Sequence, residues 1–237
     1  HEMTAWCLSY KALRGSVCVC EDMTMAFTRV LALCFLALVG SAQCGSVKNP
    51  FVIRSGTSFA SRPYSSLMTV PNGEQFGLWT WPEMCPDNFF AVGFSLRVET
   101  NQYGGDDTAL NGIRLFCGQN GDRSFLYTVE SNTGYFGEWT DPQWCPSGTL
   151  VSFQLRVETH RGMFGDDTAV NNIRFRCSSN PTLEGQGMPW GDYSHWSPEC
   201  SEGGICGIET KMEPYQGGLD DSALNDVRFH CCSRGGQ

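Results

Sequence analysis

The chain has 237 residues, a formal net charge of −9, 13 cysteines and 27 glycines. An acidic chain does not suit the phosphate backbone of a nucleic acid, so that class of partner is excluded. Thirteen cysteines without a Cys-x-x-Cys pair favour disulfides over zinc ligands, and hence an oxidising, extracellular setting. The glycines and the 12% aromatic content favour β-structure with many turns.

A secretory signal peptide is predicted over residues 23–44. A short start containing Arg29 leads into an apolar run over residues 30–39, and small residues precede a polar exit. The run is too short to span a bilayer as a helix, and no other stretch comes close to it. We therefore expect a secreted, extracellular protein with no membrane span in its mature chain.

Residues 1–22 precede this signal and are interpreted as a non-native upstream leader, because a secretory start does not require them. Translation from Met23 or from Met25 fits a normal signal, and cleavage fits after Ala42 or after Cys44. The first 44 residues carry equal numbers of acids and bases, so the mature chain keeps a charge of −9. Such a surface keeps a protein soluble and would tolerate basic partners.

Three internal repeats make up the rest of the chain and define one domain over residues 66–237. Each repeat opens with a Trp/Gly-rich segment, continues with alternating apolar and polar residues, and closes with an Asp-Asp-Thr/Ser-Ala segment, an arginine and a cysteine. The repeats cover residues 66–118, 124–178 and 182–232. Residues 45–65 form a Ser-rich N-terminal lead-in that we expect to be mobile.

Alternation with a period of two, bounded by Gly and Pro, predicts about four strands per repeat. In the first repeat these strands are expected near residues 67–70, 77–81, 89–99 and 113–117. A single four-stranded sheet cannot bury its apolar face alone, so three sheets facing one axis would share a core. The predicted fold class is therefore all-β, a prism of antiparallel sheets with pseudo-threefold symmetry.

The repeats also predict how the cysteines pair. Symmetry selects three equivalent disulfides, which join Cys85 to Cys117, Cys145 to Cys177 and Cys200 to Cys231. Each closes a loop of about 33 residues and stabilises the fold by about 4 kcal/mol in the chain-entropy estimate. Cys206 takes the place of Val92 and Val151, on a strand expected to face the core, and a fourth disulfide can join it to Cys232.

The repeated words resemble the vitelline membrane outer layer protein I family. The resemblance covers residues 73–232 and rests on DDTALN at 106–111, WPEMCPD at 81–87, FSLRVE at 94–99 and RFHCC at 228–232. The family implies a β-prism of three Greek-key, four-stranded antiparallel sheets, here stapled by disulfides. It also implies a secreted structural or barrier protein of an egg's outer layer or a mucosal secretion, with extracellular glycans and matrix proteins, including basic ones, as partners. The family has been linked with glycosyl transfer on N-acetylglucosamine oligomers, with no catalytic residues to carry over.

The repeated acidic residues allow two interpretations. As an active site, Asp106 with Asp107, or one of them with Glu99, could act as acid and base at a glycosidic bond. As structural residues, the aspartates form turns by bonding to the backbone. We favour turns, because a fold repeated three times needs its turns three times, whereas a catalytic site needs one asymmetric arrangement. Glu158 and Glu213 are the equivalents of Glu99 and are catalytic candidates on the same ground.

The basic residues of the repeats also allow two interpretations. Three share a strand face with the glutamates and three lie on a neighbouring strand, namely Arg97, Arg156 and Lys211, and Arg114, Arg174 and Arg228. We favour cross-strand ion pairs that fix strand register. The alternative is a polar cavity at one end of the prism, in which acids and arginines converge on a sugar.

Tryptophan rings offer flat apolar platforms for sugar rings. Most are expected in the core, and the sugar-binding candidates are those that break the symmetry of the repeats, Trp81, Trp144 and Trp196. No spacing of histidines and no other motif predicts a metal or a cofactor. The sequence thus favours a barrier protein with carbohydrate-binding capacity over the alternative of a glycosyl-transferring enzyme acting on N-acetylglucosamine oligomers.

Overall fold

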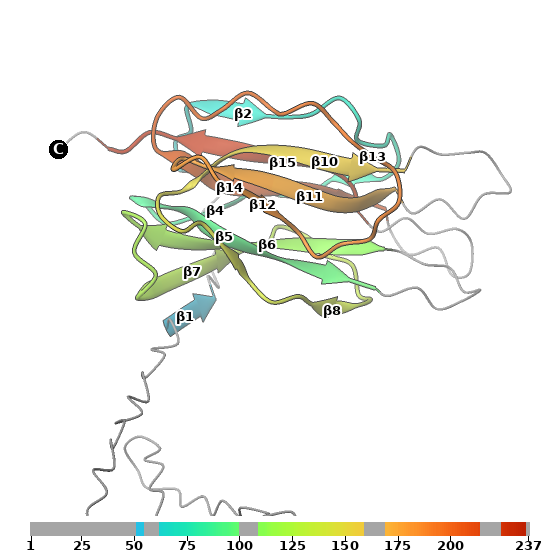
Figure 1. The fold of residues 1–237 in the computed structure, drawn as a ribbon, viewed down its shortest axis with the longest axis horizontal. Helices are drawn as coiled ribbons and strands as arrows, with labels where there is room; N and C mark the ends of the chain where they lie inside the picture. Colours follow the sequence, from blue (N-terminus) through green and yellow to red (C-terminus); the bar gives the residue numbers. More distant parts are fainter. Residues whose placement is uncertain (1–50, 55–61, 100–108, 159–168, 214–223, 236–237) are drawn as a thin grey trace, which may run out of the picture. The chain divides into compact units, whose positions relative to one another are not determined.

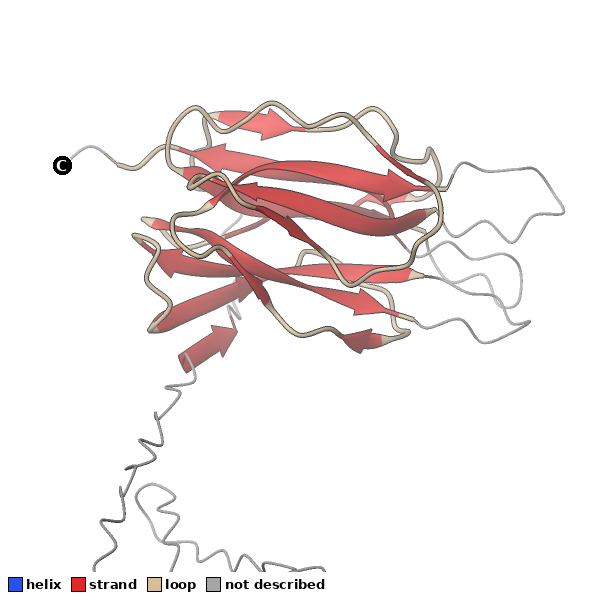
Figure 2. Cartoon of the chain, in the orientation of Figure 1, coloured by secondary structure: helices blue, strands red, loops and turns tan. Residues whose placement is uncertain are grey.

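The computed structural model describes residues 51–54, 62–99, 109–158, 169–213 and 224–235. Within these ranges every regular element is a strand, fifteen in all, as Figure 1 and Figure 2 show. The all-β prediction is confirmed. No helix in these ranges is long and apolar enough to cross a membrane. The predicted leader and signal peptide lie outside the described residues.

Three antiparallel sheets share one strand order, in which two long central strands lie between short strands on either side (Figure 1). Sheet 1 contains β7 (Phe125–Val129), β6 (Leu110–Gln119), β5 (Phe89–Val98), and β8 (Glu138–Trp139) with β9 (Gln143–Trp144). Sheet 2 contains β12 (Thr182–Glu184), β11 (Val170–Cys177), β10 (Leu150–Val157) and β13 (Asp192–Tyr193). Sheet 3 contains β2 (Ser66–Met68), β15 (Leu224–Cys232), β14 (Gly204–Met212), and β3 (Leu78–Trp79) with β4 (Glu83–Met84). The predicted prism of three sheets is confirmed.

Each sheet combines two repeats. Its central strands come from one repeat and its short strands from the next, so β7, β8 and β9 of the second repeat complete sheet 1. In sheet 3 the short strands β2, β3 and β4 come from the start of the first repeat and pair with β14 and β15 of the last. The N-terminal strands therefore close the prism. The first two strands predicted in the first repeat do form, but they belong to sheet 3.

The inward faces of the three sheets form one apolar core. Phe94 of β5, Phe153 of β10, Phe175 of β11 and Phe229 of β15 are fully buried. Their rings pack closely, with centroids 4.7 Å apart for Phe94 and Phe175 and 4.8 Å apart for Phe153 and Phe229. Burial of each ring stabilises the fold by about 1.5–3 kcal/mol.

Every central strand pair has a bulge near its start, and in β14 the bulge falls between Ile205 and Gly207. An extra residue in one strand interrupts the alternation of side chains between the two faces. Cys206 is consequently fully buried outside the main core, in a small separate cluster that also contains Met84, Phe90 and Cys232. The prediction that this position faces the shared core was wrong, because counting by twos fails across a bulge.

Four disulfides are present, and they join the pairs expected from the repeats. The three symmetric ones connect neighbouring sheets. Cys85, which directly follows β4 of sheet 3, bonds to Cys117 on β6 of sheet 1. In the same way Cys145–Cys177 joins sheet 1 to sheet 2 and Cys200–Cys231 joins sheet 2 to sheet 3. The fourth, Cys206–Cys232, lies within sheet 3.

Part of the N-terminal lead-in is ordered, which differs from the expectation. β1 (Phe51–Arg54) pairs in parallel with β7 at the outer edge of sheet 1. Arg62 donates from Nη1 to the carbonyl oxygens of Pro86 at 2.8 Å and Phe89 at 2.6 Å. Backbone pairing and a clamped guanidinium thus hold two parts of a segment whose composition alone predicts mobility.

Candidate functional site

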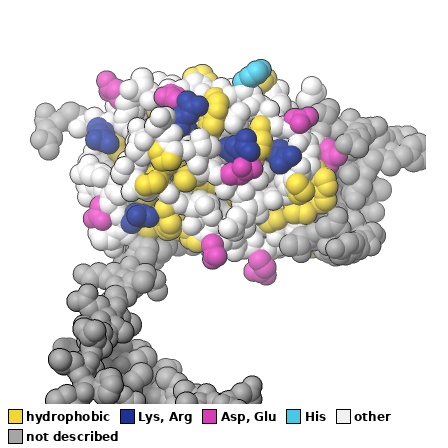
Figure 3. All heavy atoms as spheres, viewed as in Figure 1, with side chains coloured by type: hydrophobic (Ala, Val, Ile, Leu, Met, Phe, Trp, Pro, Cys, Tyr) yellow, Lys and Arg dark blue, Asp and Glu magenta, His cyan; other side chains and the backbone are white. Residues whose placement is uncertain are grey.

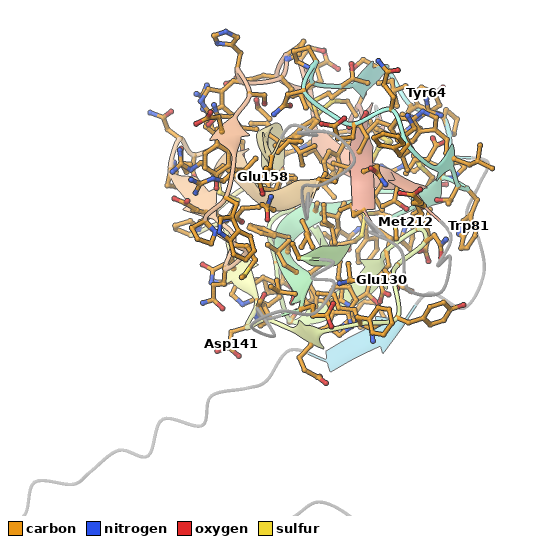
Figure 4. The ribbon with its side chains drawn as sticks, turned by 90° about the vertical axis from the view of Figure 1, so that its right-hand side faces the viewer. Tyr64, Trp81, Glu130, Asp141, Glu158 and Met212 are labelled. Atoms are coloured by element: carbon orange, nitrogen blue, oxygen red, sulfur yellow. A yellow bond between two sulfur atoms is a disulfide. The ribbon has the colours of Figure 1, made fainter. Side chains whose placement is uncertain are left out.

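Glu99, Glu158 and Glu213 occupy equivalent positions at one end of the prism. Each directly follows a long central strand, β5, β10 or β14. Figure 4 looks at this end of the sheets, with Glu158 labelled. Glu99 is 8% exposed, whereas Glu158 and Glu213 are partly exposed. The paired aspartates Asp106 and Asp107 lie outside the described residues.

The backbone positions these glutamates. The N–H of Glu99 donates to the carbonyl oxygen of Ala109, and that of Glu158 to Ala169, each at 2.9 Å. Ala109 and Ala169 have φ angles of 46° and 49°, in the left-handed region, where the chain re-enters the next central strand. The fold therefore brings the three glutamates to one end, each on a different sheet.

The basic residues that share a strand face with these glutamates hold turns. Arg97 donates to the carbonyl oxygens of Gly134 at 2.8 Å and Tyr135 at 2.7 Å. Lys211 donates to the equivalent turn, at 3.1 Å from the oxygen of Glu74 and 2.8 Å from that of Gln75. Arg156 likewise donates to the oxygen of Gly191 at 2.9 Å. These three bases fix the turns that precede the Trp/Gly-rich segments.

The other three arginines form cross-strand ion pairs on the outer faces of the sheets, as the structural interpretation predicted. The nitrogen–oxygen distances are 2.8 Å for Arg114–Glu130, 2.8 Å for Arg174–Glu184 and 2.9 Å for Arg228–Glu209. Each guanidinium also lies over an aromatic ring, at 3.9 Å from Trp139, 3.9 Å from Tyr193 and 4.2 Å from Trp79. Figure 3 shows basic, acidic and apolar side chains next to one another on the face of sheet 2.

The sequence analysis did not identify the acidic partners in these pairs. Glu130 and Glu184 follow or end equivalent short strands, so an alignment of β7 with β12 could have found them. Glu209 lies on a central strand of sheet 3, at the position of Ser95 and Gln154, and no repeated signal marks it. The ion pair is conserved in geometry across the sheets while the strand that supplies the carboxylate changes.

The three candidate tryptophans differ in how much of each ring is open. Trp81 is 51% exposed. Trp144 packs on the ring of Phe116, with centroids 4.9 Å apart, and Trp196 lies under the guanidinium of Arg176 at 4.4 Å. Of the three, Trp81 offers the most open face for a sugar ring, and Figure 4 shows it at the periphery of this end of the prism.

A row of hydroxyl groups fixes the strand that carries Trp81. Thr80 Oγ1 lies 2.9 Å from Ser131 Oγ and 3.1 Å from Thr210 Oγ1, and Ser131 donates to the carbonyl oxygen of Trp81 at 2.6 Å. Beside it, a carboxylate oxygen of Glu83 accepts from the backbone N–H of Ser131 at 2.9 Å. The indole is thus mounted on a rigid junction between sheets 1 and 3, where polar groups lie next to an open aromatic face.

Sheet 3 alone carries buried titratable groups on its outer side at positions where the other sheets have Gly112 or Asn172. Burial raises the pKa of Asp226 to about 6, against the opposing effects of the Val227 N–H, Lys211 and Arg228. Burial lowers the pKa of His230, whose two ring nitrogens have no hydrogen-bond partner. The ring of His230 packs edge-on against Tyr64, 4.6 Å away, and its Nε2 lies 3.7 Å from Glu209. Nowhere in the described ranges do three or more His, Cys, Asp or Glu side chains gather as a metal site would require.

A model of the vitelline membrane outer layer protein I family matches residues 66–234. The chain belongs to this family. A mouse (Mus musculus) and a human (Homo sapiens) vitelline membrane outer layer protein 1 homolog are each 51% identical to it, covering 72% and 71% of this chain and 85% and 84% of their own lengths. The resemblance read from the repeated words is therefore confirmed.

Among solved structures, the chain is similar to frutapin, a lectin from Artocarpus incisa, with 12% identity and a TM-score of 0.47 over 72% of this chain and 99% of that one. It is also similar to artocarpin in its mannotriose complex, with 13% identity and a TM-score of 0.45 over 71% and 98% of the two chains. At this level of similarity the ligands of those lectins say nothing about the ligand of the family member described above.

Proposed function

We propose that this chain is a secreted structural component of an egg's outer layer or of a mucosal secretion, with carbohydrate-binding capacity. Its membership of the vitelline membrane outer layer protein I family carries the proposal. Four disulfides support an extracellular location, since such bonds persist in oxidising compartments. The predicted signal peptide supports the same route.

The way the repeated polar residues are used favours a scaffold over an enzyme. Arg97, Arg156 and Lys211 hold turns, and Arg114 is one of three arginines that pin neighbouring strands. Side chains committed to backbone carbonyls and ion pairs are unavailable to bind a transition state. Three disulfides between sheets add resistance to unfolding, as a barrier layer requires.

For the sugar-binding capacity we favour Trp81 over Trp144 and Trp196. Its half-exposed ring stands on a rigid strand, so stacking on a sugar would cost little ordering of the protein. Hydroxyl groups of Thr80 and Ser131 and the carboxylate of Glu83 are adjacent hydrogen-bonding groups of the kind that orient a sugar. Extracellular glycans of the surrounding matrix are the proposed ligands, and basic matrix proteins are further proposed partners of the acidic surface.

The test is native mass spectrometry of the oxidised protein with N-acetylglucosamine tetramer, reading both the complex and the lengths of the sugars. We expect a complex with unchanged sugar, and Trp81→Ala should weaken it about tenfold by removing the stacking surface. The matched control is Leu78→Ala, which removes an apolar side chain that is 74% exposed on the same strand segment and should leave binding unchanged. Equal binding by Trp81→Ala and the parent chain would refute the assignment to Trp81.

One observation favours the alternative, a glycosyl-transferring enzyme acting on N-acetylglucosamine oligomers. Glu99, Glu158 and Glu213 lie at one end of the prism, where a pair of carboxylates could act as acid and base. In that case the same experiment yields new shorter and longer oligomers. Loss of these products in Glu99→Gln, at an unchanged melting temperature, would support the enzyme; a complex without products would leave the binding function.

A further inference from the structure

The outer edge of sheet 1 carries a strand that has no counterpart in the other two sheets. β1 pairs in parallel with β7, with Phe51 opposite Phe125, Val52 opposite Leu126 and Ile53 opposite Tyr127 (Figure 1). The equivalent outer strands β12 and β2 end their sheets in the part of the chain that the structure describes. An edge strand presents unpaired N–H and carbonyl groups, which are a template for a further strand.

We propose that the outer edge of β7 is a strand-accepting surface, and that β1 of a second copy of this chain occupies it by exchange. The proposed partner is thus another copy, and the contact is backbone pairing of the kind seen within the chain. Exchange of an identical element replaces each contact by the same contact, so it costs little free energy.

The acceptor edge is rigid. Leu126 of β7 is fully buried, and Tyr127 packs against the ring of Phe89 with centroids 5.0 Å apart. Phe125, the first residue of β7, packs against Tyr127 at 5.1 Å and is still 37% exposed. β7 therefore keeps its shape whether or not a strand covers its edge.

The donor strand is short. β1 has four residues, and opening so small an element requires no unfolding of the prism. The seven residues 55–61, three of which are serines, join it to Arg62, which is anchored on sheet 1. A link of this length spans at most about 28 Å, enough to reach a neighbouring molecule.

Protein concentration decides which copy supplies the strand. A short flexible link gives an intramolecular partner an effective concentration of about 1 mM, so exchange competes when copies are packed at a similar density. Reciprocal exchange makes a closed dimer, and exchange in one direction makes an open chain of molecules. In an extracellular layer the second outcome would connect copies into a network.

The test uses thiol pairs that can meet only through exchange, in a Cys44→Ser background. One chain carries Phe51→Cys and another carries Phe125→Cys; these residues are register partners. Mixed at about 1 mM and treated with diamide, they should form a covalent dimer of unlike chains, several-fold above the matched mixture of Phe51→Cys with Thr182→Cys. Thr182 is the matched position on the exposed edge strand β12 of sheet 2. A dimer yield no higher than with Thr182→Cys would overturn the proposal.

Two further variants keep the result decisive. A chain with both Phe51→Cys and Phe125→Cys should form its disulfide internally at low concentration, which shows that the two positions can bond. Val52→Pro/Ile53→Pro removes the backbone donors of consecutive β1 residues, and it should stay monomeric in sedimentation at concentrations where the parent chain associates. Equal association of the proline variant would place the contact elsewhere and refute the exchange.

Discussion

Gly137 shows how a single residue without a side chain permits the turn that Arg97 holds. Its φ is 78°, and an added Cβ would lie 2.3 Å from the carbonyl carbon and oxygen of Val98. Neither backbone atom can move without breaking the strand pair at the end of β5. We expect Gly137→Ala to lower the free energy of unfolding by about 3 kcal/mol, measured by urea denaturation.

Gly121 is the matched control for this prediction. Its φ of 77° is nearly the same, but an added Cβ would have its nearest neighbour at 3.3 Å, the amide nitrogen of Gly148. Gly121→Ala should therefore cost only the conformational strain, about 1 kcal/mol. Equal losses for the two variants would mean that the close approach at Gly137 relaxes freely.

At the scale of elements, β15 differs from its equivalents in carrying a buried acid. Asp226 Oδ1 accepts from the backbone N–H of Val227 at 2.7 Å, and Asn172 Oδ1 on β11 accepts from that of Ile173 at 2.8 Å. The equivalent strands thus use the same local hydrogen bond with and without a charge. Asp226→Asn should keep the bond and remove the buried charge.

The sign of the pH dependence follows from the raised pKa of Asp226. Its value of about 6 in the folded state exceeds the usual value in an unfolded chain, about 4, so ionisation destabilises the fold as pH rises through that range. We expect Asp226→Asn to raise the free energy of unfolding by about 2 kcal/mol at pH 8 and by far less at pH 4, measured by urea denaturation.

Two features isolate the effect of Asp226. The lowered pKa of His230 makes the fold lose stability as pH falls, but that contribution is common to both proteins and cancels in their difference. Asp192→Asn, an exposed acid on β13, should change stability little and equally at both pH values. A gain for Asp226→Asn that does not depend on pH would show that the carboxylate is not the cause.

The same scale shows which parts of the candidate site could be predicted. Alternation of side chains located the central strands, and thereby the shared end at which Glu99 and Glu158 lie. It could not show that Arg97 bonds to a turn of the next repeat, 37 residues away at Gly134, because a strand pattern contains no information on its neighbour. Nor could it rank Trp81 above Trp144, since exposure depends on which rings other strands bring alongside.

For the whole molecule, the disulfides between sheets determine how the prism opens. Cys85–Cys117 holds the N-terminal strands of sheet 3 to sheet 1. Replacing both residues by Ser should lower the free energy of unfolding by about 4 kcal/mol, because the unfolded chain gains the freedom of a large loop. Native-state hydrogen exchange should then accelerate first in residues 66–84, the segment that closes the prism.

The matched comparison is the equivalent bridge between sheets 1 and 2. Replacing Cys145 and Cys177 by Ser should cost a similar free energy, since the sequence separation of 32 is the same. Its faster exchange should appear in residues 138–144 and not in residues 66–84. Identical exchange profiles for the two variants would show that the prism opens as one unit and not at its separate junctions.

The sequence by itself determined the features that repeat. Three copies of one pattern predicted strands, a shared core and the pairing of eight cysteines, because equivalent residues must have equivalent roles. Even the family could be read from the repeated words, since they are local and specific.

Only the tertiary structure decided which strands pair. A short strand meets the same kind of edge in its own repeat and in the next, so local alternation cannot distinguish the two, and the chain closes by giving β2, β3 and β4 to the last repeat. The bulge that removes Cys206 from the core and the parallel pairing of β1 with β7 are likewise contacts between distant segments. Strand propensity depends on each segment alone, whereas partner, register and face are set by the surfaces that meet when the core is buried.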